Sequence, residues 1–350
     1  MKLQILLTVA LFITIKSLSQ TTPVPDPAFE AKLISLGIDT NGMNGNILNS
    51  DAEGVTNLNV SNSGISNLAG IEAFVDLLML DCEDNTISTL DLSFNTMLTF
   101  LDCNNNTLSS LNINANTDLI SLNASDNSLT NINLANNLAL SDITLQNNQL
   151  TDLDLANNSN LYQIVAHDNS LTSITFPASP TLLEIVWIYN NSLTNIDLTT
   201  APTLATLRFE NNDLVFLDLR NGNNTNINTM DARDNPNLQL ICVDDVVFAS
   251  NATNWNKDAT AEYSETCILG NYDNSNFDVV IAPNPATNSF NIQLNTNTEI
   301  ETLEWINLAG QKQSLAVAET VDVSTFASGI YFLKITLRDG RQHTHKIIRK

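Results

Sequence analysis

Side chains suited to acid–base or metal chemistry are scarce in this chain of 350 residues. It has three histidines and four cysteines, and two of the histidines, His343 and His345, lie close to the C-terminus. His167 is the only other histidine. No serine, histidine and aspartate constellation is visible, although two carboxylates could still meet on one face of a regular fold. The sequence therefore predicts a protein that is not an enzyme and that needs no cofactor or metal.

Residues 165 to 233 hold side chains suited to binding a partner. Aromatic and aliphatic side chains alternate there with charged ones, and exposed aromatics beside arginine are typical of the centres of binding surfaces. The candidate binding residues are Val165, His167, Ile185, Trp187, Tyr189, Arg208, Glu210 and Arg233. Whether they share one face depends on the elements that position them.

Those elements follow from a repeat. Asparagines recur at intervals of 21 to 23 residues at positions 85, 106, 127, 148, 169, 191, 212 and 235, and the residues eight, five and three places before each are apolar. A fixed period of this length predicts a stack of coils. Each coil holds two short strands turned by asparagine-rich corners, so we expect sheet on both faces and slight curvature. The positions between the buried ones on the first strand then form three exposed columns.

The candidate binding residues occupy these columns if every coil keeps the same register. One coil, the one ending at Asn191, is 22 residues long. A shift of register by one residue there would turn Trp187 inward and disperse the cluster. Both alternatives are open at the level of the sequence.

The pattern LxxLxLxxN resembles the leucine-rich repeat over about residues 55–243. The resemblance implies a mainly β solenoid of about eight to nine 21-residue coils. We expect a short N-terminal helical cap before this solenoid and a small C-terminal β-sandwich after it. The resemblance also implies that the repeated asparagine points inward and bonds the backbone of its own and the neighbouring coil, because an unpaired buried amide costs about 1–3 kcal/mol.

The N-terminal residues predict a signal and a cap. Residues 1–20 hold an early lysine, an apolar run and small residues, as in a cleaved secretory signal peptide, and no later segment is long and apolar enough to span a membrane. Within residues 21–54, the span Pro25–Ile38 predicts a short helix. Asp39–Asp51 resembles a calcium loop but has one inserted residue and ends in Asp51 where glutamate is usual. That departure favours a turn-rich connector over a calcium site.

The four cysteines fall into two pairs. Cys82 and Cys103 occupy the same buried slot of successive coils, where parallel strands aim both sulfurs the same way, so we expect free thiols. Cys242 and Cys267 flank 24 residues just after the last coil. In an exported chain this spacing predicts a disulfide that staples a C-terminal cap over residues 244–270.

Residues 271–350 break the period and predict a separate β-rich domain. Their landmarks are Pro283, Asn284 and Pro285, then Gly310, then Gly329 and Tyr331, and finally Lys346 and Lys350. Their order resembles the C-terminal sorting domain of type IX secretion in bacteria of the Bacteroidetes type. The resemblance implies recognition by the type IX machinery, export across the outer membrane, and a body that is secreted or attached to the cell surface.

Charge narrows the class of partner. Lys+Arg number 14 and Asp+Glu 38, a net charge of −24, which excludes nucleic-acid binding through phosphate neutralisation. No lysine or arginine lies between Leu33 and Leu207, and Arg208, Arg220 and Arg233 gather at the end of the repeat. We therefore expect a protein, peptide or glycan ligand on the last coils.

An alternative is a structural or adhesive surface spacer without a discrete ligand site, which collects cations. It rests on a polar column along the second strands. The column consists of Asp91, Asn112, Asn133, Asp154, Thr175, Asp197 and Asp218.

Overall fold

The computed structural model describes residues 20–266, 279–294, 299–307, 311–338 and 342–350. The predictions for residues 1–19, Cys267 and Gly310 fall outside these ranges. The chain divides into two compact units, Met1–Cys267 and Ile268–Lys350. Each unit is described by itself.

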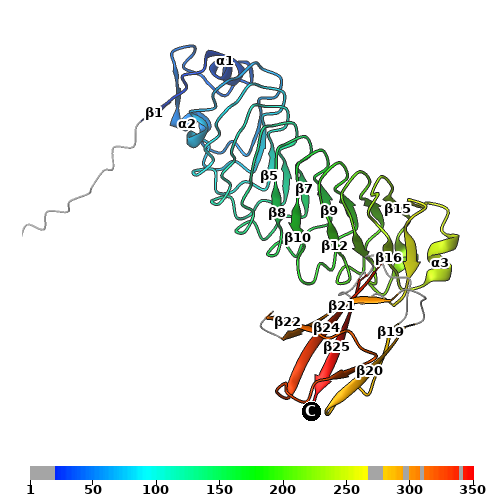
Figure 1. The fold of residues 1–350 in the computed structure, drawn as a ribbon. Coiled ribbons are helices and arrows are strands. Elements are labelled where there is room, and N and C mark those ends of the chain that lie inside the picture. The colour runs from blue at the N-terminus through cyan, green and yellow to red at the C-terminus, as the bar shows by residue number, and fades with distance from the viewer. Residues whose placement is uncertain (1–19, 267–278, 295–298, 308–310, 339–341) are drawn as a thin grey trace, which may run out of the picture. The chain divides into compact units, whose positions relative to one another are not determined.

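The first unit is a solenoid with few helices (Figure 1). Its helical elements are α1 (Pro27–Ser35), α2 (Asn49–Ala52) and α3 (Val246–Asn251), with short 3-10 turns η1 (Ile71–Ala73) and η2 (Asn224–Asn226). Its strands are β1 (Thr21–Pro23), β2 (Asn46–Leu48), β3 (Asn57–Asn59), β4 (Met79–Asp81), β5 (Phe100–Asp102), β6 (Ser121–Asn123), β7 (Asp142–Thr144), β8 (Asp152–Asp154), β9 (Gln163–Val165), β10 (Ser173–Thr175), β11 (Ile185–Trp187), β12 (Asn195–Asp197), β13 (Thr206–Arg208), β14 (Phe216–Asp218), β15 (Thr229–Ala232), β16 (Leu240–Cys242), β17 (Trp255–Lys257) and β18 (Glu262–Ser264).

The first strands of the coils form one parallel sheet of ten strands, in the order β17-β15-β13-β11-β9-β7-β6-β5-β4-β3. The central residue of each three-residue strand from β3 to β13 faces the core; Leu80, Leu101 and Leu122, for example, pair in register and are buried. Because side chains alternate between the two faces of a strand, the residues on either side of each central one face outward. The predicted leucine-rich solenoid is confirmed, with about ten turns.

The second strands form a less regular face than expected. The last coils pair in the sheets β8–β10 and β12-β14-β16-β18, whereas among the described residues the early coils show only an isolated bridge between Asp91 and Asn112. On this face, hydrogen bonds from side chains join the early coils in place of strand pairing. The Asn116 amide nitrogen donates to the carbonyls of Leu92 (3.2 Å) and Asn95 (2.8 Å) in the preceding coil.

The repeated asparagines point inward, as predicted. In the first full coil, Asn85 Nδ2 donates to the carbonyls of Val60, Cys82 and Glu83, each at 3.0 Å, and Asn85 Oδ1 accepts from the Ile65 backbone N–H at 2.9 Å. The residue before each ladder asparagine has a positive φ near 50°, a conformation that asparagine and aspartate tolerate better than other non-glycine residues. These corner residues are Asp84, Asn105, Asp126, Asn147, Asp168, Asn190, Asn211 and Asp234.

A helical cap closes the N-terminal end, as predicted. Asp26 begins α1, because its Oδ1 accepts from the backbone N–H groups of Ala28 (2.8 Å) and Phe29 (3.2 Å). Its Oδ2 accepts from the backbone N–H of Ser66 (2.8 Å), which belongs to the first coil. Burial raises the pKa of Asp26, but these hydrogen bonds outweigh it and lower the pKa. Phe29 and Leu33 of the helix are fully buried against the core.

The segment expected to form the C-terminal cap adds one strand to each of the two sheets of the solenoid. Strand β17 pairs with β15, so Trp255 takes the place of the usual buried leucine opposite Met230. The indole N–H of Trp255 donates to the Ile227 carbonyl at 3.0 Å, and Phe248 and Tyr263 pack edge-on against its ring. Burial raises the pKa of Tyr263 to about 12.

The cysteines of the early coils are free, as predicted. Cys82 and Cys103 are both fully buried thiols, and burial raises the pKa of each. Cys242 is also buried, but the position of Cys267 lies outside the described residues. The staple between Cys242 and Cys267 therefore stays a prediction.

The second unit consists of antiparallel strands around its own core. Its sheets have the orders β19-β20-β23 and β22-β21-β24-β25. The strands are β19 (Val279–Ala282), β20 (Ser289–Leu294), β21 (Ile300–Asn307), β22 (Lys312–Leu315), β23 (Thr320–Asp322), β24 (Gly329–Leu337) and β25 (Gln342–Arg349). Trp305 is buried at the centre and stacks between Phe290 (6.0 Å) and Tyr331 (4.6 Å between ring centroids). Within the described ranges of the chain, the helices are all too short or too polar to cross a membrane.

Candidate functional site

The 22-residue coil keeps the register of the sheet. Trp187 pairs with Val165 on one neighbouring strand and with Arg208 on the other. Val186 is fully buried, and Trp187 on the opposite side of the strand is half-buried. The alternative in which Trp187 turns into the core is therefore wrong, and the three outward columns run through this region unbroken.

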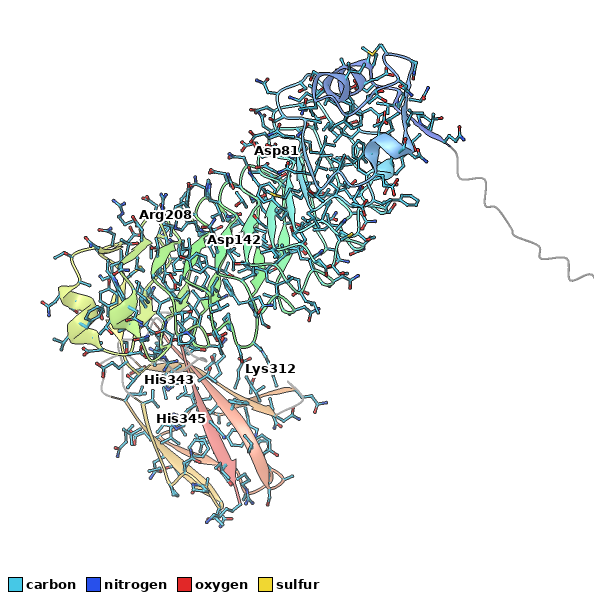
Figure 2. All side chains as sticks on the ribbon, turned by 180° about the vertical axis from the view of Figure 1, so that it is seen from behind. Asp81, Asp142, Arg208, Lys312, His343 and His345 are labelled. Atoms are coloured by element: carbon cyan, nitrogen blue, oxygen red, sulfur yellow. The ribbon has the colours of Figure 1, made fainter. Side chains whose placement is uncertain are left out.

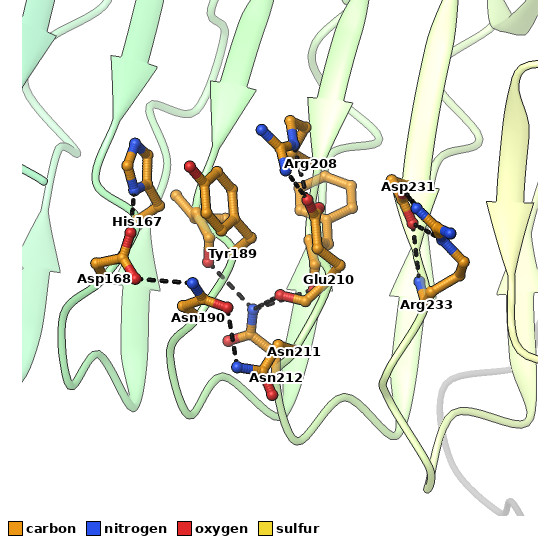
Figure 3. A network of polar contacts seen from close by, with 12 residues as sticks. His167, Asp168, Tyr189, Asn190, Arg208, Glu210, Asn211, Asn212, Asp231 and Arg233 are labelled. Carbon is orange, nitrogen blue, oxygen red and sulfur yellow. Dashed lines mark hydrogen bonds and ion pairs between the residues drawn. The ribbon is translucent and has the colours of Figure 1, made fainter.

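Three of the candidate residues form a stack across three successive coils. The rings of His167 and Tyr189 lie nearly parallel, with centroids 4.1 Å apart and planes at 9°. The Arg208 guanidinium carbon lies 4.0 Å from the Tyr189 ring centroid. We refer to His167, Tyr189 and Arg208 as the stacked triad (Figure 3).

Polar corner residues hold the histidine end of the stacked triad. His167 Nδ1 lies 2.5 Å from Asp168 Oδ2, and Asp168 Oδ1 accepts from Asn190 Nδ2 at 2.7 Å. Asn190 Oδ1 in turn accepts from Asn211 Nδ2 at 2.9 Å, and Figure 3 shows this chain running beneath the stack. Burial raises the pKa of Asp168, but the bonds from Asn190 and His167 outweigh it and lower the pKa. Asp168 therefore stays ionised beside the imidazole.

Glu210 holds the arginine end of the stacked triad. Arg208 Nε donates to Glu210 Oε1 at 2.7 Å, and Arg208 Nη2 donates to the same oxygen. Partial burial lowers the pKa of Arg208, but its hydrogen bond and ion pair with Glu210 outweigh burial and raise the pKa. Burial also raises the pKa of Tyr189, so its hydroxyl remains protonated at neutral pH. The stacked triad thus offers a phenol hydroxyl, an imidazole edge and a neutralised ion pair.

The other candidate residues contribute less. Val165 is only 5% exposed, so the expectation that it forms part of the exposed cluster is wrong. It lies in the middle column between Thr144 and Trp187, whose strands flank it on both sides. Ile185 is half-buried in the first column. Arg233 lies apart from the triad and forms its own ion pair with Asp231 at 2.6 Å.

Sequence reasoning missed the residues that hold the triad in place. Asp168 and Asn190 were visible only as corner residues, and their common signal is the Asn/Asp preference at the positive-φ position. Two further atoms were not predictable at all. Trp187 Nε1 and Glu210 Oε2 are buried and have no hydrogen-bond partner in the described part of the chain. A donor and an acceptor of this face are therefore unsatisfied.

The early coils carry the acidic end of the same face, at the opposite end of the sheet from Arg208 (Figure 2). Burial raises the pKa of Asp81, and repulsion from Glu83, Asp102 and Asp84 adds to it. Met79 is exposed in the neighbouring column. The outward face of the sheet is therefore acidic in its first coils and aromatic with paired arginines in its last coils.

The polar column of the second strands binds its own backbone. Asp91 Oδ1 accepts from the Ser93 backbone N–H (3.0 Å), and Asp154 Oδ1 accepts from the Ala156 backbone N–H (3.0 Å). Asp218 is buried and pairs with Arg220 at 2.6 Å, so it is not an exposed member of the column. In the described ranges, no group of three or more His, Cys, Asp or Glu residues is arranged to hold a metal ion.

The landmarks of the second unit converge in space although they are far apart in sequence. Asn284 Nδ2 donates to the Lys346 carbonyl (2.7 Å), and its Oδ1 accepts from the Ile348 backbone N–H (2.9 Å). Lys350 donates its backbone N–H to the Ala286 carbonyl at 2.9 Å. Asn284, with a proline on each side, thus fastens the last strand of the chain.

Comparison with known families identifies this second unit. Residues 280–350 match the family model of the secretion system C-terminal sorting domain. This domain directs type IX export to the cell surface or to the medium. The comparison with curated proteins found no match.

Several solved structures are similar to the chain, and three of them are proteins from Listeria monocytogenes and Yersinia enterocolitica. The functional domain of InlJ from Listeria monocytogenes, described as including a cysteine ladder, is 18% identical with a TM-score of 0.41, covering 95% of this chain and 99% of that one. Internalin C2 from the same species is 22% identical with a TM-score of 0.45, covering 69% and 97%. YopM from Yersinia enterocolitica is 23% identical with a TM-score of 0.43, covering 59% and 45%.

The repeat architecture and the family match lead to one conclusion about identity. The chain combines a leucine-rich repeat solenoid with a C-terminal sorting domain for type IX secretion.

Proposed function

We propose that this exported protein binds a protein or peptide partner through the stacked triad and Trp187 on the last coils. The observation that carries the proposal is the stack itself. Imidazole, phenol and guanidinium from three coils are held face to face by partners on their own or neighbouring corners. Tyrosine, tryptophan and arginine are the residues that contribute most to binding energy in protein interfaces.

Rigidity supports the same proposal. A side chain that is ordered before binding loses little conformational entropy when a partner arrives, and each rotamer-rich side chain immobilised on binding costs about 0.5–1.5 kcal/mol. Tyr189 and Arg208 are already fixed by each other and by Glu210. Contacts made by these side chains therefore contribute to affinity with a small entropic cost.

The covered faces of Tyr189 argue for a polypeptide over a sugar. His167 occupies one neighbouring position and Arg208 the other, at 4.1 Å and 4.0 Å from the ring. A sugar ring usually stacks on an open aromatic face. What Tyr189 still presents is its hydroxyl, which can both donate to and accept from the polar groups of a peptide backbone.

The test is retention of a partner by matched variants. The protein is immobilised and exposed to surface proteins of its own cells and of host cells. We expect the wild type to retain a defined protein, and we expect Tyr189→Ala and Trp187→Ala to lose it without a change in melting temperature. Thr175→Ala, an exposed change on the second face of the solenoid, is the control. Equal retention by all variants would exclude this site.

The alternative of a structural spacer without a discrete site makes the opposite prediction. It rests on the polar column of the second strands, whose side chains already accept backbone N–H groups. Isothermal titration with magnesium separates its cation-collecting version from the binding proposal. Uptake of several ions per chain that Asp154→Asn and Asp197→Asn reduce would favour the spacer.

A further inference from the structure

The loop Asp39–Asp51 of the N-terminal cap follows the residue order of a calcium loop. That pattern places an acidic residue at position 1, an oxygen-bearing side chain at 3, glycine at 6, an apolar residue at 8 and a carboxylate at 12. Asp39 and Asn41 occupy positions 1 and 3. With one inserted residue, Gly45, Ile47 and Asp51 occupy positions 6, 8 and 12.

The structure shows how the loop accommodates its inserted residue. Met43 projects outward with 58% of its surface exposed. Gly42 and Gly45 on either side have φ values of +84° and +79°, which only glycine adopts without cost. Glu30 of helix α1 anchors the turn from inside, because its Oε1 accepts from the backbone N–H groups of Asn44 (2.7 Å) and Gly45 (2.6 Å). The insertion therefore bulges away from the interior of the loop.

The residues after the insertion return to the positions that the pattern requires. Ile47 is fully buried and pairs with Thr22 in the short antiparallel sheet of the cap. Asp51 Oδ2 accepts from the backbone N–H (2.9 Å) and the hydroxyl (2.8 Å) of Thr40, next to position 1. The carboxylate of position 12 thus closes the loop beside Asp39.

Two oxygens at positions 1 and 3 are left without partners. Asp39 is only 4% exposed; its Oδ1 accepts from the Asn41 backbone N–H (3.1 Å), but its Oδ2 is buried and has no partner in the described residues. Asn41 Oδ1 is likewise buried and unpartnered, although its Nδ2 donates to Asn46 Oδ1 (3.1 Å). No ion pair of the described chain includes Asp39. A buried carboxylate without a positive partner is unfavourable.

We propose that the loop Asp39–Asp51 binds a calcium ion, with Asp39 Oδ2 and Asn41 Oδ1 as side-chain ligands and Asp51 closing the site. Calcium accepts amide and backbone carbonyl oxygens as well as carboxylates, so the site needs no cluster of three acidic residues. The few charged ligands place its dissociation constant in the range of extracellular modules, about 10⁻⁴–10⁻³ M. The inserted residue made a connector the better interpretation of the sequence, and the two unpartnered oxygens reverse that interpretation.

The experiment is calcium titration of the full chain by calorimetry and thermal melting. Wild type is expected to bind one calcium ion in this cap and to melt at a higher temperature in 5 mM calcium chloride than in chelator. Asp39→Asn removes the ligand charge and is expected to weaken binding at least tenfold. Asp118→Asn makes the same chemical change at an exposed position of the solenoid outside every proposed site, and it is expected to leave the affinity unchanged.

A gain-of-affinity variant keeps the test decisive if Asp39→Asn fails to fold. Asn41→Asp adds a second carboxylate at position 3 and is expected to tighten calcium binding several-fold. Absence of calcium-dependent heat and of a melting shift in the wild type would overturn the proposal. It would also be overturned by an unchanged calcium response in a folded Asp39→Asn, or by a response in Asn41→Asp no stronger than in the wild type.

Discussion

The asparagine ladder predicts a large loss of stability from a single substitution, Asn85→Ala. The buried Asn85 amide makes four bonds of 2.9–3.0 Å to the backbone, joining the first two coils. Alanine leaves the Ile65 N–H and the Val60 carbonyl buried without their partner. Each unsatisfied buried group costs about 1–3 kcal/mol, so leaving two of them unpaired should cost about 2–6 kcal/mol in free energy of unfolding.

Urea denaturation of wild type and variant measures this cost, with Asn131→Ala as the matched control. Asn131 is exposed, and its side chain donates only to Thr130 Oγ1 at 3.3 Å. An exposed change of this kind should alter the free energy of unfolding by less than about 0.5 kcal/mol. The melting temperature should fall by about 4–24 °C for Asn85→Ala, given about 2–4 °C per kcal/mol for a domain of this size. A cost below about 1 kcal/mol, or one equal to that of the control, would refute the ladder as the main link between coils.

Three further predictions concern the caps, the thiols and the tail. Hydrogen bonds lower the folded-state pKa of Asp26, so its contribution to stability is complete above the unfolded-state pKa and is lost as pH falls through the folded-state pKa. The difference in free energy of unfolding between wild type and Asp26→Asn should therefore shrink below about pH 4, as measured by urea denaturation at a series of acidic pH values. Because burial raises the pKa values of Cys82 and Cys103, both thiols should resist alkylation in the native protein. After unfolding without reductant, thiol titration should find two thiols per chain, and with reductant it should find four if the predicted disulfide is present. Asn284→Ala should loosen the last strand and lower export in a type IX-competent host, measured as protein in the medium or on the cell surface, whereas the exposed change Gln313→Ala should leave export unchanged.

Much of the fold was predictable because the same pattern of apolar residues and asparagine recurs in each coil. A leucine or isoleucine in the same slot of successive coils faces the same core, and an asparagine at the corner has the same backbone groups to satisfy each time. The end of the solenoid was not predictable in this way. Trp255 occupies a leucine slot without the surrounding repeat pattern, so the pairing of its strand with β15 could not be read from the repeat.

The candidate site was predictable in position but not in detail. The spacing placed Trp187 and Tyr189 on the outward face, and the register of strand β11 agrees with it. The contacts of Tyr189 with His167 and Arg208 depend on side-chain rotamers in three coils, which no spacing rule specifies. The burial of Val165 likewise depends on the size of the side chains beside it.

The central claim is that the stacked triad on the last coils recognises a polypeptide partner. The most direct measurement is the affinity of the retained partner for wild type, Tyr189→Ala and Thr175→Ala, each checked for an unchanged melting temperature. Because truncation of a central aromatic residue of an interface costs about 2 kcal/mol or more, Tyr189→Ala should bind at least about 30-fold more weakly, while Thr175→Ala should match the wild type. Equal affinity of all three proteins would contradict the proposed site.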